Sequence, residues 1–145
     1  MIATPPFDGD TARAMSKENV EIAREAIATY SRTGKSPENL FDPEVTVWES
    51  PELPGELAGK GLGNLARVNE NLLDSFEEWS IEQEKFFDLG ERILVFVRFC
   101  ARGKSSGVQV DASLAYLLTL RDGRVIEWGL FGDRSKALEA AGLSE

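Results

Sequence analysis

The stretch Ile93-Leu94-Val95-Phe96-Val97-Arg98-Phe99-Cys100 is rich in β-branched and aromatic residues, which is typical of a central β-strand. A second run of this kind covers residues 108–120 and ends at the turn Arg121-Asp122-Gly123-Arg124. The Asp-Gly pair in this turn favours a tight hairpin, and a third run, residues 125–131, follows it directly. The sequence therefore predicts a meander of antiparallel strands in the C-terminal half of the chain.

Apolar residues occupy both alternating positions of the first of these strands. Ile93, Val95 and Val97 fall on one side, and Leu94 and Phe96 fall on the other. One face of the sheet is expected to cover the helices, and the other is too apolar to be left in water. The simplest hypothesis is a twofold homodimer formed through the sheet.

Helical spacing appears before the strands. Residues 16–33 recur with a helical period, Ser16 is a suitable N-cap, and Gly34 stands where a helix would end. A short second helix is predicted over residues 36–41. Residues 1–14 show no sustained period and hold Pro and Gly, so we predict a mobile N-terminal tail and one domain over residues 15–145.

The middle of the chain adds a strand, a loop, a long helix and another strand, at residues 45–49, 50–63, 65–79 and 81–87. A closing helix is predicted between Asp133 as N-cap and Gly142. Segregated helices followed by hairpin-linked strands indicate an α+β fold with a mostly antiparallel sheet packed on about three helices plus a short C-terminal helix.

Composition excludes several kinds of chemistry. The 145 residues carry a formal net charge of −9 and contain no histidine and one cysteine, Cys100. Imidazole catalysis, His-ligated zinc and an internal disulfide are thereby excluded, and the lone thiol fits a reducing cytoplasm. The negative charge disfavours nucleic acids and anionic membranes as partners. Neither a membrane-spanning apolar run nor a secretory signal is evident, so we expect a cytoplasmic protein without metal or cofactor.

The ordered set of motifs resembles the SnoaL-like polyketide cyclases of the nuclear transport factor 2-like superfamily, which includes ketosteroid isomerase and limonene epoxide hydrolase. The resemblance runs from about residue 16 to the end of the chain. It is carried by the following segments: Ser16–Arg24, Phe41–Pro51, Gly61 with Leu65, Thr119–Trp128 and Phe131–Leu143. The resemblance implies a cone-shaped α+β roll, in which a strongly curved sheet wraps around helices and leaves a pocket, and it implies a homodimer.

The catalytic positions of these families transfer only in part. The oxyanion donors and the base of ketosteroid isomerase fall near Ile27, Tyr116 and Ser50, and the acid–base pair of the cyclases falls near Tyr116 and Leu130. Arg98-Phe99-Cys100 stands near the Arg-x-Asp of the epoxide hydrolase. None of the three constellations is intact in this sequence.

The best remaining acid–base candidate is Glu49, which follows the first strand near the expected pocket mouth. Tyr116, with Ser50, would polarise a ligand carbonyl. The alternatives are a core tyrosine bonded to backbone and a Glu49 side chain rotated outward.

Six further residues are predicted to bind the ligand: Ile27, Trp48, Phe76, Arg98, Trp128 and Leu130. For the tryptophans the alternative is plain core packing. Arg98 would bind a ligand carboxylate or pair with an acidic residue such as Glu49 or Asp111.

Two functions from different classes stay open at this point. The first is a cofactor-free isomerase, cyclase or dehydratase for a hydrophobic polyketide-, steroid- or terpenoid-like substrate. The second is a non-catalytic module that binds a small hydrophobic molecule or dimerises and has lost the family's acids. A catalyst needs a carboxylate inside the pocket, whereas a binder needs only shape and a few hydrogen bonds.

Overall fold

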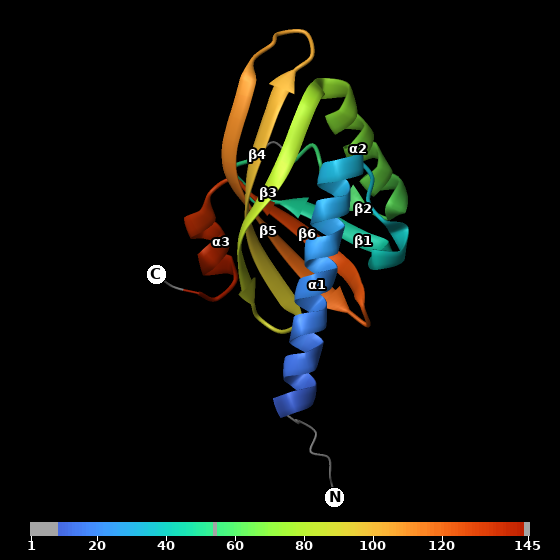
Figure 1. Ribbon diagram of the computed structural model, residues 1–145, viewed down its shortest axis with the longest axis vertical. Helices are drawn as coiled ribbons and strands as arrows, with labels where there is room; N and C mark the ends of the chain where they lie inside the picture. Colours follow the sequence, from blue (N-terminus) through green and yellow to red (C-terminus); the bar gives the residue numbers. More distant parts are fainter. Residues whose placement is uncertain (1–8, 54, 144–145) are drawn as a thin grey trace, which may run out of the picture.

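The computed structural model describes residues 9–53 and 55–143, with side chains from residue 17 onward (Figure 1). The elements in chain order are α1 (Gly9–Thr33), the 3₁₀ helix η1 (Glu38–Leu40), β1 (Phe41–Glu49), β2 (Gly59–Lys60), α2 (Leu62–Ser75), β3 (Phe76–Asp88), β4 (Arg92–Gly103), β5 (Gln109–Arg121), β6 (Arg124–Phe131) and α3 (Arg134–Ala140).

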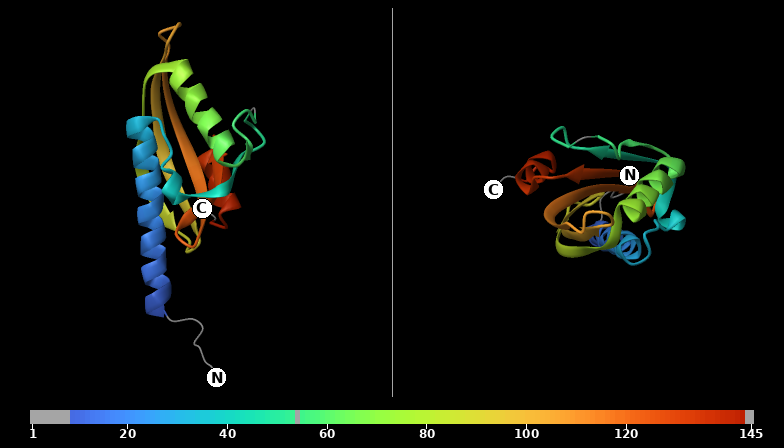
Figure 2. Two further views of the ribbon diagram at one scale, coloured as in Figure 1. Left: turned by 90° about the vertical axis from the view of Figure 1, so that its right-hand side faces the viewer. Right: turned by 90° about the horizontal axis from the view of Figure 1, so that it is seen from above.

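The strands form one six-stranded sheet in the order β2-β1-β6-β5-β4-β3. Among the described strands every pairing is antiparallel except β1 with β6. The sheet is strongly curved and stays open; α1 and α2 lie on its concave side and α3 on the other side (Figures 1 and 2). The predicted α+β roll with a mostly antiparallel sheet is confirmed.

The concave face forms the main core. Ile93, Val95 and Val97 of β4 are fully buried there, together with Leu118 of the neighbouring β5. The helices contribute Ala23, Ala26 and Ile27 from one side of α1, and none of these side chains is exposed. The apolar residues that recur at helical spacing in α1 therefore form the stripe that packs on the sheet.

The opposite, convex face is covered by the chain's own C-terminal helix. Leu94 and Leu117 point to this side and pack with Phe131 and with Ala137 of α3. Both leucines are buried without any second chain. The apolar second face, which led us to expect a homodimer, is thus explained by α3, and the homodimer itself stays a prediction.

The first helix begins earlier than expected. α1 starts at Gly9, not at Ser16, so residues 9–14 of the predicted tail are helical. The prediction of a mobile tail also covers residues 1–8, which lie outside the described residues. The predicted helix end is confirmed: α1 stops at Thr33, and Gly34 adopts a φ of +74° while its N–H donates to Tyr30 O at 2.8 Å.

The prediction of a helix through residue 79 is wrong in its last turn. α2 ends at Ser75, and Phe76 already pairs with Gly103 as the first residue of β3. A register shift between Phe76 and Glu78 places Phe76 and Trp79, three residues apart, on the same sheet face. This β-bulge imitates the helical spacing on which the prediction rested.

The predicted helix over residues 36–41 is likewise shorter than expected. It is a three-residue 3₁₀ helix, Glu38–Leu40, and β1 takes over at Phe41 rather than at Val45. Pro43 is accommodated in β1 where the pairing with β6 is irregular, between Phe41 and Thr46, since proline cannot donate to a sheet ladder.

Candidate functional site

A small cavity lies between the helices and the concave face of the sheet. Its volume is about 80 Å³. The lining comes from α1, α2, the loops that follow α1 and β1, and strands β1, β5 and β6, and consists of Tyr30, Ser36, Val47, Leu57, Leu65, Val68, Asn69, Tyr116, Trp128 and Leu130. Most of these groups are apolar, and no described lining residue carries a charge.

Two phenols line the cavity, one from a strand and one from a helix. Tyr116 stands on β5 at the register position of Leu130 and packs edge-on against Trp128, with ring centroids 4.9 Å apart. Tyr30 comes from the last turns of α1 and packs against Trp79 at 5.3 Å. Within the described residues neither phenol hydroxyl makes a hydrogen bond, so both are available to a ligand.

Burial controls the ionisation of both tyrosines. Desolvation raises the pKa of Tyr30 and of Tyr116 well above the ordinary value near 10, and the proximity of Tyr30 raises the pKa of Tyr116 further. Both side chains therefore stay protonated at neutral pH. They are hydrogen-bond donors toward a carbonyl oxygen or another acceptor, and neither can serve as a base.

The remaining polar groups of the lining satisfy each other. The Asn69 amide of α2 contacts the Ser36 hydroxyl at 3.1 Å. In the orientation that satisfies the whole amide, its oxygen accepts from Ser36 Oγ and N, and its nitrogen donates to Leu65 O at 3.3 Å. This pair therefore closes one wall of the cavity.

Glu49 lies at the edge of the cavity and not in its lining. Its carboxylate accepts a hydrogen bond from Leu57 N at 2.8 Å, and Glu49 pairs in register with Leu130. The Asn64 amide donates to Leu57 O at 3.2 Å from the other side. The carboxylate predicted to be a proton acceptor thus holds the backbone of Leu57, whose side chain lines the cavity.

Ser50, the next residue, is buried outside the cavity. Its backbone N–H donates to Leu130 O at 2.9 Å, and only 2% of the residue is exposed. The hydroxyl makes no hydrogen bond of good geometry, yet together with the backbone N–H of Glu52 and the ammonium of Lys136 it lowers the pKa of Glu52. Ser50 does not line the cavity, so it is not placed to polarise a ligand there.

The remaining predicted residues divide among three locations. Tyr116, Trp128 and Leu130 line the cavity. Ile27 is fully buried in the core, and Phe76 packs edge-on against Phe99 at 5.5 Å. Neither of these two lines the cavity.

Trp48 and Arg98 lie on the convex face, where neither lines the cavity. Trp48 packs on Phe131 at 5.3 Å and over Gly129, where an added Cβ would come within 2.2 Å of the indole ring. The parallel register of β1 and β6 pairs Trp48 with Gly129 and Val47 with Trp128. Only one tryptophan of this pair of strands therefore faces the cavity.

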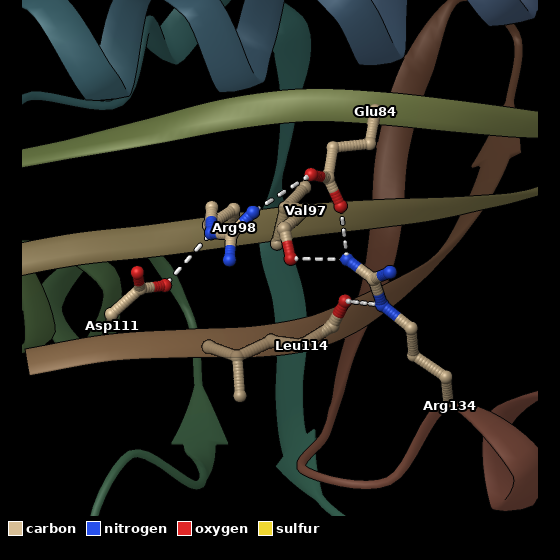
Figure 3. Close-up of polar contacts among 6 residues, drawn as sticks. All are labelled: Glu84, Val97, Arg98, Asp111, Leu114 and Arg134. Atoms are coloured by element: carbon tan, nitrogen blue, oxygen red, sulfur yellow. Dashed lines mark hydrogen bonds and ion pairs between the residues drawn. The ribbon is translucent and has the colours of Figure 1, made fainter.

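Arg98 forms part of a charged network on the convex face (Figure 3). Its guanidinium pairs with Asp111 at 2.8 Å and with Glu84 at 3.7 Å, and these carboxylates raise its pKa. Arg134 also binds Glu84, at 2.5 Å, and donates to Val97 O and Leu114 O. The alternative that Arg98 pairs with an acidic residue is thus the one observed.

Sequence reasoning missed the second phenol. Tyr30 continues the stripe of Ala23 and Ile27 on α1, one turn beyond the position matched to the ketosteroid isomerase donor. That stripe predicted a buried tyrosine, but only the packing shows that its ring reaches the cavity. Ser36 and Asn69 gave no signal, since their contact joins residues 33 apart in the chain.

The described part of the chain contains neither a metal-binding cluster nor a membrane-spanning helix. Within residues 9–53 and 55–143, no cluster of three or more Cys, Asp or Glu side chains is placed to hold a metal ion. None of the described helices is long and apolar enough to cross a bilayer. The cytoplasmic location stays a prediction.

Comparisons with known proteins define the fold. No protein-family model and no curated protein matches the sequence. A protein from Jannaschia sp. assigned to the SnoaL-like polyketide cyclases superposes with a TM-score of 0.69 at 20% identity, over 89% of this chain and 94% of that one.

Two further solved structures are similar and hold small molecules. A protein from Catenulispora acidiphila with a ketosteroid isomerase-like fold, in complex with trimethylamine, matches at a TM-score of 0.69 and 17% identity, covering 85% and 93% of the two chains. TerC, co-crystallised with polyporic acid, matches at 0.68 and 16%, covering 86% and 98%. The chain therefore has the fold of the SnoaL-like and nuclear transport factor 2-like proteins.

Proposed function

We propose that the cavity binds a small neutral molecule that is mostly apolar and carries a hydrogen-bond acceptor such as a carbonyl oxygen. The single observation that carries the proposal is the pair of phenols, Tyr30 and Tyr116, whose hydroxyls have no partner in the described chain and share a mostly apolar, uncharged lining. An acceptor atom of a ligand placed between these two hydroxyls would give each donor a hydrogen-bond partner inside the cavity.

A binding module is favoured over a catalyst because the lining contains no carboxylate. Acid–base catalysis needs a titratable group within hydrogen-bond reach of the reacting atom. The two phenols of the lining stay protonated, and no carboxylate lines the cavity to accept a proton. Two proteins of this fold were crystallised with trimethylamine and with polyporic acid, which supports small-molecule binding as the role of the hollow.

A cofactor-free isomerase, cyclase or dehydratase is the second candidate. It is favoured by Glu49, whose carboxylate is one hydrogen bond away from Leu57 of the lining. In this reading the phenols would stabilise an enolate oxygen and Glu49 would move the proton. Glu49 would first have to release Leu57 N.

The test compares 2-butanone with 2-methyl-1-butene, which has the same shape and lacks the acceptor. Binding is measured by ligand-observed NMR and by the change in the protein's tryptophan fluorescence, to which Trp128 of the lining contributes. We expect the ketone to bind more tightly, and Tyr116→Phe or Tyr30→Phe to weaken its binding roughly fivefold, the value of one net hydrogen bond.

The matched control removes a hydroxyl outside the cavity. Thr29 is on α1 next to Tyr30, and its hydroxyl binds the exposed Glu25 carboxylate. Thr29→Val should leave ketone binding unchanged. Equal affinity for the ketone and the alkene, or no binding of either, would contradict the proposed function.

A further inference from the structure

The cavity alone is too small for most metabolites. Its 80 Å³ corresponds to the liquid volume of only two or three water molecules, at about 30 Å³ each. Pockets that enclose whole organic ligands measure roughly 300–1,000 Å³. A ligand that places its acceptor between Tyr30 and Tyr116 must therefore extend beyond the cavity if it has more than a few heavy atoms.

A second hollow adjoins the cavity on the helix side. It measures about 270 Å³ and lies between α2 and the segment that joins α1 to η1. We call it the vestibule. Its lining residues are Gly34, Lys35, Ser36, Glu38, Leu62, Leu65, Ala66, Asn69, Glu70 and Leu73. Ser36, Leu65 and Asn69 line both hollows, so these three side chains form the junction.

The wall that α2 contributes to the vestibule is apolar except for Asn69 and Glu70. Leu62, Leu65, Ala66 and Leu73 recur at helical spacing and line it together. Leu73 is 41% exposed, and among the described residues only Val108 is a comparably exposed large hydrophobic side chain. Lys35, Glu38 and Glu70 supply the charged groups of this hollow. An apolar wall with charged residues beside it fits an aliphatic chain better than a polar group.

We infer that the vestibule is the binding site for the apolar tail of an elongated ligand whose acceptor end lies between the two phenols. The inference rests on the proposed function and specifies its ligand class: a carbonyl compound with a straight hydrocarbon chain. The tail passes the junction beside Leu65. To open this route, the Asn69 side chain changes its rotamer, and this change breaks its contact with Ser36.

A series of methyl ketones from 2-butanone to 2-nonanone tests the inference by titration calorimetry. The carbonyl end of each ketone lies in the cavity, and each further methylene extends the chain into the vestibule. Burying one methylene strengthens binding about fourfold, so we expect affinity to rise at each step with a stoichiometry of one. Asn69→Ala, which opens the junction, should strengthen binding of the long ketones.

Leu73 and Val108 provide a matched pair of variants on the surface. Leu73→Ser should weaken 2-nonanone binding by roughly fivefold and leave 2-butanone unchanged, because only the longer chain reaches it. Val108→Ser removes another exposed hydrophobic side chain, in the segment between β4 and β5, and should change the binding of neither ketone.

Three outcomes would overturn the inference. Affinity that stops rising after 2-butanone, or equal effects of Leu73→Ser and Val108→Ser on 2-nonanone, would show that the vestibule holds no tail while the proposed function stands. Failure of every ketone to bind would instead remove the proposed function, and the tail site with it.

Discussion

The two faces of the β4–β5 ladder differ in whether their polar side chains have partners within the described chain. On the convex face, Arg98 and Arg134 are matched by Asp111 and Glu84, and Arg134 also reaches two backbone carbonyls (Figure 3). On the concave face, Tyr116 of the same β5 has a hydroxyl without a partner among the described residues. The charged groups of the convex face have partners within this chain, whereas in the proposed function a ligand supplies the partner of the concave-face phenol.

The convex face breaks most easily at Arg134. Arg134→Ala removes hydrogen bonds to Val97 O at 2.8 Å and Leu114 O at 3.2 Å, the ion pair with Glu84 and the packing on Phe96. We expect a loss of about 2–3 kcal/mol in the free energy of unfolding, measured by urea titration.

The control for this prediction is Asp111→Asn. The pair of Asp111 with Arg98 is solvent-exposed, so the urea midpoint of unfolding should stay within error of the wild-type value. Equal effects of the two variants would contradict this account.

The concave face should respond to alkaline pH. The folded pKa values of Tyr30 and Tyr116 are raised by burial, so the unfolded chain releases these protons first, near pH 10. Folding stability is then fully present below pH 10 and falls as pH rises above it, by about 1.4 kcal/mol per tyrosine between pH 9 and 11.

The matched variant for this pH effect is Tyr30→Phe/Tyr116→Phe, which keeps both rings and removes both protons. Urea unfolding at pH 9 and pH 11 should show a smaller loss in the double variant than in the wild type. Identical losses would mean that the phenols are not buried as the structure places them.

The smallest expected effect concerns the border of the cavity. Glu49→Ala removes the acceptor of Leu57 N and should destabilise the local fold by about 1 kcal/mol, seen as roughly fivefold faster hydrogen exchange at that amide. Glu49→Gln keeps an oxygen acceptor and should change the exchange far less. A residue that acts as a base would lose its role in both variants. If turnover of a substrate is found and disappears in Glu49→Gln, the catalytic candidate replaces the binding module.

Local signals in the sequence predicted the ends of several elements correctly. The Asp122-Gly123 turn adopts positive φ at both residues, and β5 pairs with β6 across it. Asp133 caps α3 by accepting from Ser135 N at 2.8 Å. These features depend on neighbours within a few residues, so a single chain segment contains all the information they need.

The cavity could be predicted only in part, because its lining comes from segments far apart in the chain. Tyr116 was expected from alternation along an antiparallel strand, whose register a hairpin sets, and Leu130 from the resemblance to the cyclases; both line the cavity, as does Trp128. Trp48 was misplaced because β1 joins the sheet by a parallel pairing with β6, and no turn sets that register. Phe76 was wrongly predicted to lie in a helix because the β-bulge at the start of β3 places Phe76 and Trp79, three residues apart, on the same face.

The amino-acid sequence by itself determined the α+β class, the strand meander, the helix caps and the absence of imidazole and multi-thiolate chemistry, because composition and short-range periodicity specify these. The tertiary structure alone decided that α3 covers the convex face, that Glu49 holds Leu57 and that Tyr30 joins Tyr116 at an uncharged cavity. Each of these depends on contacts between residues distant in the chain, whose geometry arises only when the curved sheet closes around its helices.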